Sequence, residues 1–263
     1  MRQRGFTLME LLVTMLILAI IAIGVTSFIN FSTRIYVDSQ QWGDAVAQQR
    51  YGMQRLSLEV RDALPGSVSV TTGATAHCLN FRPIVDSGHF LEAPLHNNPQ
   101  QISIFAMDCC TAAGCQDCIP DDAGDQFGVA ILDGYSVPNP LPRFPSSSCN
   151  GDNICTLNLD TAMTQGDFSV GKRFYLAGAP ISYCLQNNGA LVRSSGSEVS
   201  TMGEGYTNNL AACDLNARNN EQCPFIVQPP SLARNNVVKL QLWLTQAGQS
   251  TRFAQEVQLE NVP

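Results

Sequence analysis

The first five residues read MRQRG, and an apolar run, FTLMELLVTMLILAIIAIGV, follows from Phe6 to Val25. Glu10 is the only charged residue in this run. Extended to Ile29, the run reaches the roughly 20 residues that an α-helix needs to cross a bilayer. The two arginines of the leader place the N-terminus in the cytoplasm by the positive-inside bias, so we expect the rest of the chain outside it.

The position of the small residue Gly5 separates this segment from a secretory signal peptide. A signal peptide carries its small-residue cleavage site after the apolar run, whereas Gly5 precedes the run. Cleavage after Gly5 would remove the basic leader and leave the apolar helix on the mature protein. An uncleaved signal anchor is the simpler alternative, but it does not account for the sequence GFTLME at residues 5–10.

Residues 5–10 resemble the prepilin processing motif that type IV pilins share with the pseudopilins of type II secretion. The resemblance implies cleavage between Gly5 and Phe6, N-methylation of Phe6 by the prepilin peptidase/methylase, and retention of Glu10. An unpaired carboxylate at membrane depth costs about 2.5 kcal/mol or more, and the new amine of Phe6 in a neighbouring subunit would partner it. We therefore expect Glu10 to fix the register in which the helices stack.

The helical pattern continues to a stop at the sequence DALPG, residues 62–66, where proline and glycine end it. Apolar side chains recur at spacings built from threes and fours, which keeps them on one helical face: Phe28, Phe31, Ile35, Trp42, Val46, Met53, Leu56, Val60 and Leu64. We predict one helix over 6–64, about 88 Å long. Residues 6–29 form its transmembrane and assembly part, and residues 30–64 form an amphipathic part that packs on a sheet.

Residues 65–263 form the predicted extracytoplasmic head. Its strand candidates are short, alternating or β-branched, and bounded by turn residues: 67–71, 76–82, 101–107, 173–176, 181–186, 191–193, 237–245 and 251–260. Turn sequences at 187–189 and 246–249 predict two hairpins, and we expect the second to be the spine of a sheet. The stretch 108–171 is predicted to be mostly loop, with a Cys-rich region at 108–156.

These features predict an α+β fold of the type IV pilin-like kind, in which one long N-terminal helix packs on an antiparallel β-sheet head with disulfide-braced loops. Later stretches are similar to the minor pilins of the mannose-sensitive haemagglutinin (MSHA) pilus of the O type, with the W-type minor pilins as wider relatives: 49–56, 59–63, 173–176, 180–184, 191–193 and 261–263. Together with the leader, the resemblance covers about half the chain. The region from Cys109 to Cys155 matches no pattern of that family.

Ten cysteines lie beyond the apolar run: Cys78, Cys109, Cys110, Cys115, Cys118, Cys149, Cys155, Cys184, Cys213 and Cys223. In an oxidising exterior their even number favours disulfides, although about 945 pairings are possible. Short loops favour the pairs Cys149–Cys155 and Cys213–Cys223. If the cluster at 109–118 forms two nested pairs, Cys78 and Cys184 are left to pair with each other.

Metal binding and redox chemistry are the alternatives for some of these residues. The sequence CQDC at 115–118 is a C-x-x-C motif, which zinc ligands and redox enzymes also use, but a second C-x-x-C is missing. Three acidic residues lack the spacing of a known calcium loop, namely Asp121, Asp122 and Asp125. Two histidines near Glu92 are interpreted as ordinary loop residues, His89 and His96. We therefore expect no metal and no cofactor.

Composition bears on the remaining function classes. The chain has 15 Lys and Arg against 22 Asp and Glu, a net charge of −7, and loss of the leader makes it more acidic. Such a balance does not suggest nucleic-acid binding, which needs a basic surface. The sequence contains no G-x-S-x-G, H-E-x-x-H or P-loop motif, so we do not expect an enzyme.

The sequence therefore predicts a minor pilin that is processed by prepilin peptidase and is incorporated into, or primes, a type IV pilus of the MSHA kind that contributes to surface attachment. Its expected partners are other major and minor pilins, the peptidase/methylase and the inner-membrane assembly platform. The expected location is a single-pass inner-membrane protein with an extracytoplasmic head, and later the pilus at the cell surface. The alternatives are a minor pseudopilin of type II secretion and a tip adhesin whose Cys-rich loop, 109–155, binds a surface ligand.

Overall fold

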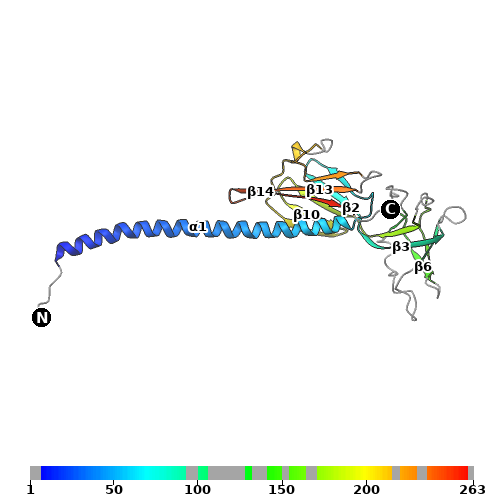
Figure 1. The fold of residues 1–263 in the computed structure, drawn as a ribbon, viewed down its shortest axis with the longest axis horizontal. Helices are drawn as coiled ribbons and strands as arrows, with labels where there is room; N and C mark the ends of the chain where they lie inside the picture. The colour runs from blue at the N-terminus through cyan, green and yellow to red at the C-terminus, as the bar shows by residue number, and fades with distance from the viewer. Residues whose placement is uncertain are drawn as a thin grey trace. The chain divides into compact units, whose positions relative to one another are not determined.

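The structure, a computed structural model, describes residues 7–92, 100–105, 128–131, 141–149, 154–163, 171–214, 220–229 and 236–259 (Figure 1). One long helix precedes a series of strands that pair in an antiparallel manner, which confirms the predicted α+β class. The chain divides into two compact units, Met1–Ala47 with Gln246–Gln249, and Gln48–Thr245 with Ser250–Pro263. Each unit is described by itself.

Helix α1 runs from Leu8 to Arg61, close to the predicted span of 6–64. In the first unit every residue of α1 from Leu8 to Gln41 is exposed. The buried residues of α1 all belong to the second unit: Gln49, Gly52, Met53, Leu56, Ser57 and Val60. The prediction that the apolar face packs on a sheet is confirmed for this second group.

The same prediction is wrong for the earlier part of the face. Phe31 and Ile35, in the part 30–64 that was predicted to pack on a sheet, are 64% and 53% exposed. Their spacing puts them on a helical face, but no other described residue covers them. The periodic pattern marks a face that needs a partner, and it does not say that the partner is in the same chain.

A five-stranded sheet and a three-stranded sheet share a hydrophobic core with one face of the C-terminal part of α1. The larger one has the order β1-β2-β9-β10-β11, formed by Ser69–Thr72, Ala76–Phe81, Ile181–Gln186, Leu191–Ser195 and Glu198–Gly203. The smaller one has the order β12-β13-β14, formed by Phe225–Gln228, Val237–Gln246 and Gln249–Gln258. Both predicted hairpins are present, as β9–β10 and β13–β14, and β13 is the central strand of its sheet.

One hydrophobic core joins the helix to these two sheets. Leu56 and Val60 of α1 share a buried cluster with Leu79, Tyr183 and Leu240 of the strands. Close approach of helix and sheet depends on small residues: a Cβ atom added at Gly52 would lie 3.2 Å from the backbone oxygen of Met202 in β11. The helix is therefore held over β11 at a separation that only a glycine permits without adjustment.

A third, six-stranded sheet has its own hydrophobic cluster. Its order is β5-β8-β3-β4-β7-β6, formed by Gly128–Ala130, Arg173–Ala177, Ile84–Glu92, Gln101–Phe105, Ile154–Asn158 and Ser146–Cys149. Three of these strands, β5, β6 and β7, lie in the stretch 108–171. The prediction that this stretch, including the region 108–156, is mostly loop is wrong for them, because strands this short carry too few apolar residues to show a period.

Candidate functional site

Thr7 caps the N-terminal end of α1, a role that the prepilin motif does not by itself predict. The backbone N–H of Glu10 donates to Oγ1 of Thr7 at 3.3 Å and to the Thr7 carbonyl oxygen at 3.1 Å. Thr7 is therefore the N-cap of α1, and the spacing of Thr7 and Glu10 is that of a capping box. The T-x-x-E pattern in the sequence was the signal that could have revealed it.

The Glu10 side chain lies in the first turn of α1 and is exposed. A carboxylate there is favoured by the partial positive charge of the helix N-terminus. Within the described part of the chain, no hydrogen bond or ion pair of the Glu10 carboxylate is present. Its sequence-predicted partner, the amine of Phe6, and the predicted cleavage site at Gly5 both lie outside the described residues, so these two assignments remain predictions.

The apolar side chains of α1 on both sides of Glu10 are exposed. Large apolar side chains between Leu8 and Val37 are between 44% and 84% exposed. In the part of the chain that the structure describes, α1 is the one helix long and apolar enough to cross a membrane. Exposed apolar area of this kind costs about 25 cal/mol per Å² in water, so the segment requires lipid or other protein chains around it.

In the head, Glu59 of α1 connects the helix to the five-stranded sheet. Its carboxylate accepts hydrogen bonds from Arg193 Nε of β10 at 3.0 Å, from Tyr183 Oη of β9 at 3.0 Å and from Arg55 Nε at 3.0 Å. Arg55 and Glu59 are not among the residues of the apolar face that the sequence predicts to pack on a sheet. The structure instead brings Glu59 against two strands, and only the i,i+4 spacing of the pair hinted at a connection.

This network sets the charge state of its members. Burial by itself would raise the pKa of the Glu59 carboxyl, but the hydrogen bonds from Arg193, Arg55 and Tyr183 outweigh it and lower that pKa. Burial and the neighbouring carboxylate raise the pKa of the Tyr183 hydroxyl. Glu59 therefore stays ionised and Tyr183 stays protonated at neutral pH. In these charge states the hydrogen bonds that Glu59 of α1 accepts from Tyr183 of β9 and Arg193 of β10 are maintained.

Two disulfides are present in the described head, in the pairs that the sequence analysis considered. Cys78 of β2 and Cys184 of β9, which face each other across the two strands, are joined. Cys213 and Cys223 close a short loop. Cys155 is also disulfide-bonded.

The other cysteine assignments lie outside what the structure describes. The ladder between β6 and β7 places residue 149 directly opposite Cys155, but the Cys149 side chain is not described. The cluster formed by Cys109, Cys110, Cys115 and Cys118 lies outside the described residues, as do the acidic residues Asp121, Asp122 and Asp125. Their pairing and the zinc and calcium alternatives therefore stay open.

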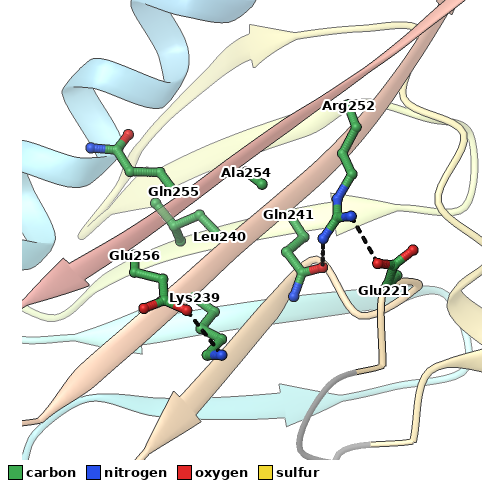
Figure 2. Close-up of a pocket in the computed structure, with 8 residues that line it drawn as sticks. All are labelled: Glu221, Lys239, Leu240, Gln241, Arg252, Ala254, Gln255 and Glu256. Carbon is green, nitrogen blue, oxygen red and sulfur yellow. Dashed lines mark hydrogen bonds and ion pairs between the residues drawn. The ribbon is translucent and has the colours of Figure 1, made fainter.

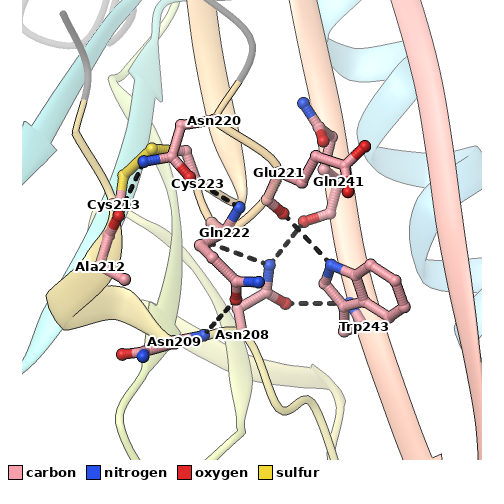
Figure 3. Close-up of a disulfide and its surroundings, with 10 residues drawn as sticks. All are labelled: Asn208, Asn209, Ala212, Cys213, Asn220, Glu221, Gln222, Cys223, Gln241 and Trp243. Atoms are coloured by element: carbon pink, nitrogen blue, oxygen red, sulfur yellow. Dashed lines mark hydrogen bonds between the residues drawn. A yellow bond between two sulfur atoms is a disulfide. The ribbon is translucent and has the colours of Figure 1, made fainter. Parts of the chain in front are cut away.

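Polar side chains fix the segment that carries the Cys213–Cys223 disulfide to the three-stranded sheet (Figure 3). Asn208 Nδ2 donates to the carbonyl oxygen of Gln241 at 2.9 Å, and Asn208 Oδ1 accepts from the backbone N–H of Trp243 at 2.9 Å. Trp243 Nε1 donates to the carbonyl oxygen of Glu221 at 3.2 Å. These contacts hold Asn208 and Glu221 beside β13.

An open, polar recess lies on the outer face of β13 and β14 (Figure 2). Two ion pairs cross it, Lys239 Nζ to Glu256 Oε1 at 2.9 Å and Arg252 Nη1 to Glu221 Oε1 at 2.9 Å. Arg252 also donates to Gln241 Oε1 at 2.8 Å. The two ion pairs therefore use the charged side chains that line the recess.

The histidines do not form a metal site in the described residues, where no group of three potential ligands comes together. His77 is buried in β2, its ring bonds to the backbone of Leu210, and burial lowers its pKa. The interpretation of His89 as a loop residue is wrong, because His89 is an exposed residue of strand β3, where neighbouring strands pair with this stretch. His96 lies outside the described residues, and the side chain of Glu92 is not described.

Comparison with known proteins identifies the N-terminal segment. Residues 1–26 match the family model described as the prokaryotic N-terminal methylation motif. No curated protein and no solved structure matches the chain. The match includes the leader, Glu10 and the apolar run, and it implies processing by prepilin peptidase and assembly with other pilins. Together with a membrane-capable helix that continues into a β-rich, disulfide-containing head, it supports a type IV pilin-like protein, a structural class that includes the pseudopilins.

Proposed function

We propose that the chain is a minor pilin that prepilin peptidase cleaves after Gly5, and that the mature subunit joins or primes a type IV pilus of the MSHA kind. The observation that carries the proposal is the exposed apolar surface of α1 with a single carboxylate, Glu10, at its N-terminal end. A bundle of such helices buries the apolar surface, and Glu10 meets the methylated amine of Phe6 of the next subunit.

The Glu10 carboxylate then acts as the register element of the assembled helices. In an apolar surrounding, a helix displaced along its neighbour would leave both the carboxylate and the amine unpaired, and each unpaired charge is costly. The apolar side chains alone allow many displacements, because they are similar along the whole run from Leu11 to Val25. One polar pair in an otherwise apolar contact selects one of them.

The Glu10→Ala variant tests this proposal. We expect the leader to be removed as in the parent, because Gly5 and Phe6 are unchanged, while the variant is lost from sheared, purified fibres. The matched control is Thr14→Ala, which changes a polar residue in the same run, whose hydroxyl donates to the Leu11 carbonyl of its own helix. Incorporation of the Glu10→Ala variant at the parental level would contradict the register role.

The pseudopilin alternative shares the N-terminal argument and differs in the polymer that is formed. Counting surface pili by electron microscopy in a strain without the gene, and in the complemented strain, separates the two. Few or no pili support a minor pilin of the pilus. Normal pili with a defect in protein secretion would instead indicate a pseudopilus component.

The contribution to surface attachment is proposed to come from the Cys-rich region 109–155. Loops on a rigid scaffold often carry recognition, and this region is an insertion that the similar stretches of the minor pilins do not include. Deletion of residues 109–127, which contain four of its cysteines and leave the strands β5, β6 and β7 in place, should abolish adhesion while the number of pili stays the same. Unaltered adhesion of the deletion strain would contradict this part of the proposal.

A further inference from the structure

Strand β14, Gln249–Gln258, is the edge of the three-stranded sheet. It is long for an edge strand and contains neither proline nor glycine. Natural proteins usually shorten, bend or cover such an edge, because its free N–H and C=O groups are a template for another strand. Among the described residues no backbone hydrogen bond is made on the outer side of β14.

The register of the β13–β14 hairpin shows which backbone groups are free. Its two turn residues, Ala247 and Gly248, have φ values of 50° and 76°, and the backbone N–H of Leu259 donates to the Asn236 carbonyl at 3.1 Å. Leu259 therefore turns its backbone groups toward β13. Because these groups alternate along an antiparallel strand, the even-numbered residues direct theirs outward: Ser250, Arg252, Ala254, Glu256 and Gln258.

A recess lies on each side of this edge. On the outer face is the polar recess of about 370 Å³ shown in Figure 2. On the helix side is a groove of about 640 Å³ between β14 and α1, which contains the exposed side chain of Leu58. Gln255 and Glu256 line both. A strand added to β14 would direct alternate side chains into the two recesses, as in recognition by strand addition.

We propose that the strand which pairs with this edge is β14 of a second copy of the chain. In an antiparallel pair centred on Ala254, Arg252 lies opposite the partner's Glu256, and Glu256 lies opposite the partner's Arg252. Ala254 faces the partner's Ala254, where a small side chain allows close approach. Opposite charges directly across two strands stabilise the pair, and the contact is isologous, so it closes as a dimer.

The ion pairs of the outer recess extend across this contact without a clash of charges. Within one chain Lys239 pairs with Glu256, and Arg252 pairs with Glu221. Pairing of two β14 strands makes a continuous row in the order Lys239, Glu256, the partner's Arg252 and the partner's Glu221, in which the signs alternate. Charged side chains on an edge strand usually prevent pairing with another strand. On β14, however, Arg252 and Glu256 are complementary in charge to the same two residues of a second copy.

The symmetry of the pair determines which chains it joins. The two-fold axis between antiparallel strands is perpendicular to the sheet, and it reverses every direction in the plane of the sheet. It therefore also reverses the C-terminal part of α1, which packs along the head sheets. Neighbours in one polar fibre have parallel helices, so this contact joins subunits of two fibres. That role rests on the proposed function, whereas the pairing rests on the edge alone.

Exchange of Ala254 tests the pairing in the full chain purified in detergent micelles. The Ala254 N–H points outward, so Ala254→Pro removes an edge donor and no hydrogen bond within the hairpin, while Ala254→Ser keeps the donor as the matched control. We expect light scattering during size-exclusion chromatography to show a dimer for the parent and for Ala254→Ser, and dimerisation about tenfold or more weaker for Ala254→Pro. Unchanged mobility on non-reducing gels and an unchanged unfolding midpoint would show that each variant is folded.

Charge reversal gives a second, independent test. Arg252→Glu places two acidic residues opposite each other at both ends of the pair, so we expect a weaker dimer. The double variant Arg252→Glu/Glu256→Arg restores opposite charges across the pair, although contacts within each chain stay disrupted, so recovery of the dimer reports on the contact between copies.

Three results with the purified chain would overturn the proposal: a monomeric parent, an Ala254→Pro variant that dimerises like the parent, and a double variant that does not recover. A dimer that persists in Ala254→Pro would show that the chains associate through the apolar part of α1 and not through β14. A photo-crosslinker at position 254 that reacts in cells with a different fibre subunit would show that another chain occupies the edge. All of these outcomes leave the Glu10→Ala experiment unaffected, so failure of the pairing is distinct from failure of the proposed function.

Discussion

The two parts of helix α1 show how one continuous helix meets two requirements. From Leu8 to Gln41 all its residues are exposed, including a dense set of large apolar side chains. From Gln49 to Val60 one face is buried in the head, and Glu59 is tied to β9 and β10. The first part needs partners outside the chain, whereas the second finds its partners within it.

This difference teaches that hydrophobic content alone does not locate the core of this protein. The most apolar segment has none of its residues buried, while the segment that anchors the head is mixed in character and includes Gln49 and Ser57 among its buried residues. Stability of the head and assembly of the subunit therefore depend on different stretches of the same helix. Pairs of variants, one at a buried and one at an exposed position, test which residues stabilise the head.

The largest effect on the head is expected for Leu56→Ala. Leu56 is 0% exposed, and Leu58, two positions further along the helix, is 52% exposed. Removal of a buried leucine side chain leaves a cavity and costs about 2–5 kcal/mol, whereas Leu58→Ala should change the free energy of unfolding by about 0.5 kcal/mol or less. Urea unfolding of both variants, followed by circular dichroism, measures the difference. Equal losses would mean that the helix does not pack on the sheets through Leu56.

Two glycines of α1 provide the next comparison. A Cβ atom at Gly52 would lie 3.2 Å from the backbone oxygen of Met202, while a Cβ atom at Gly43 would have no other atom within 4 Å. Gly52→Val should therefore force the helix away from β11 and lower the free energy of unfolding by about 1–3 kcal/mol. Gly43→Val should leave it unchanged or raise it slightly, because glycine is a poor helix former. A thermal unfolding midpoint that falls equally in both variants would contradict the close approach at Gly52.

The Glu59 network should contribute more than an exposed ion pair. Glu59 is 21% exposed and accepts from three side chains, whereas Glu256 is 63% exposed and pairs with Lys239. We expect Glu59→Gln to cost about 1.5–3 kcal/mol and Glu256→Gln to cost about 0–1 kcal/mol. Because the folded-state pKa of Glu59 is lowered, its contribution is present above its unfolded pKa of about 4.5 and is lost as the pH falls through the folded value. Denaturant titrations at neutral and acidic pH should show that Glu59→Gln removes part of the acid sensitivity.

The smallest effect is expected for His77. It is buried with Nδ1 unpartnered among the described residues, and burial lowers its pKa below 6.5. The unfolded chain therefore binds the proton more readily, so stability is present above about pH 6.5 and decreases as the pH falls below that value. The thermal midpoint should fall from about pH 7.5 to about pH 5.5, and His77→Leu should reduce that fall. Replacement of the exposed His89 by glutamine is the control, and an unchanged pH dependence in His77→Leu would contradict the assignment.

The sequence was sufficient to predict a helix or a hairpin wherever that element has its own apolar periodicity or turn residues. The long helix, its stop near Pro65, and the hairpins at 187–189 and 246–249 could all be read from spacing and turn residues. The strands β3, β5, β6, β7, β11 and β12 could not. Strand β3 contains Asp86, Ser87 and Gly88, and β6 is mostly serine, so neither shows a run of alternating apolar residues, and they become strands because neighbouring strands pair with them.

The candidate functional residues also fall into two groups, those that a local sequence motif predicts and those that only the fold brings together. The leader, Gly5, Phe6 and Glu10 lie in one short stretch, which matches the N-terminal methylation motif, and their roles are predicted from the sequence alone. The sequence by itself also determined that the apolar helix needs partners outside the chain, because hydrophobicity and charge are properties of the chain alone. The hydrogen bonds of Glu59 to Tyr183 and Arg193, the pairing of Cys78 with Cys184, and the edge of β14, which no other described strand pairs with, were decided only by the tertiary structure. Each depends on residues that are far apart in sequence, and strand order and register bring them together or leave them without a neighbour.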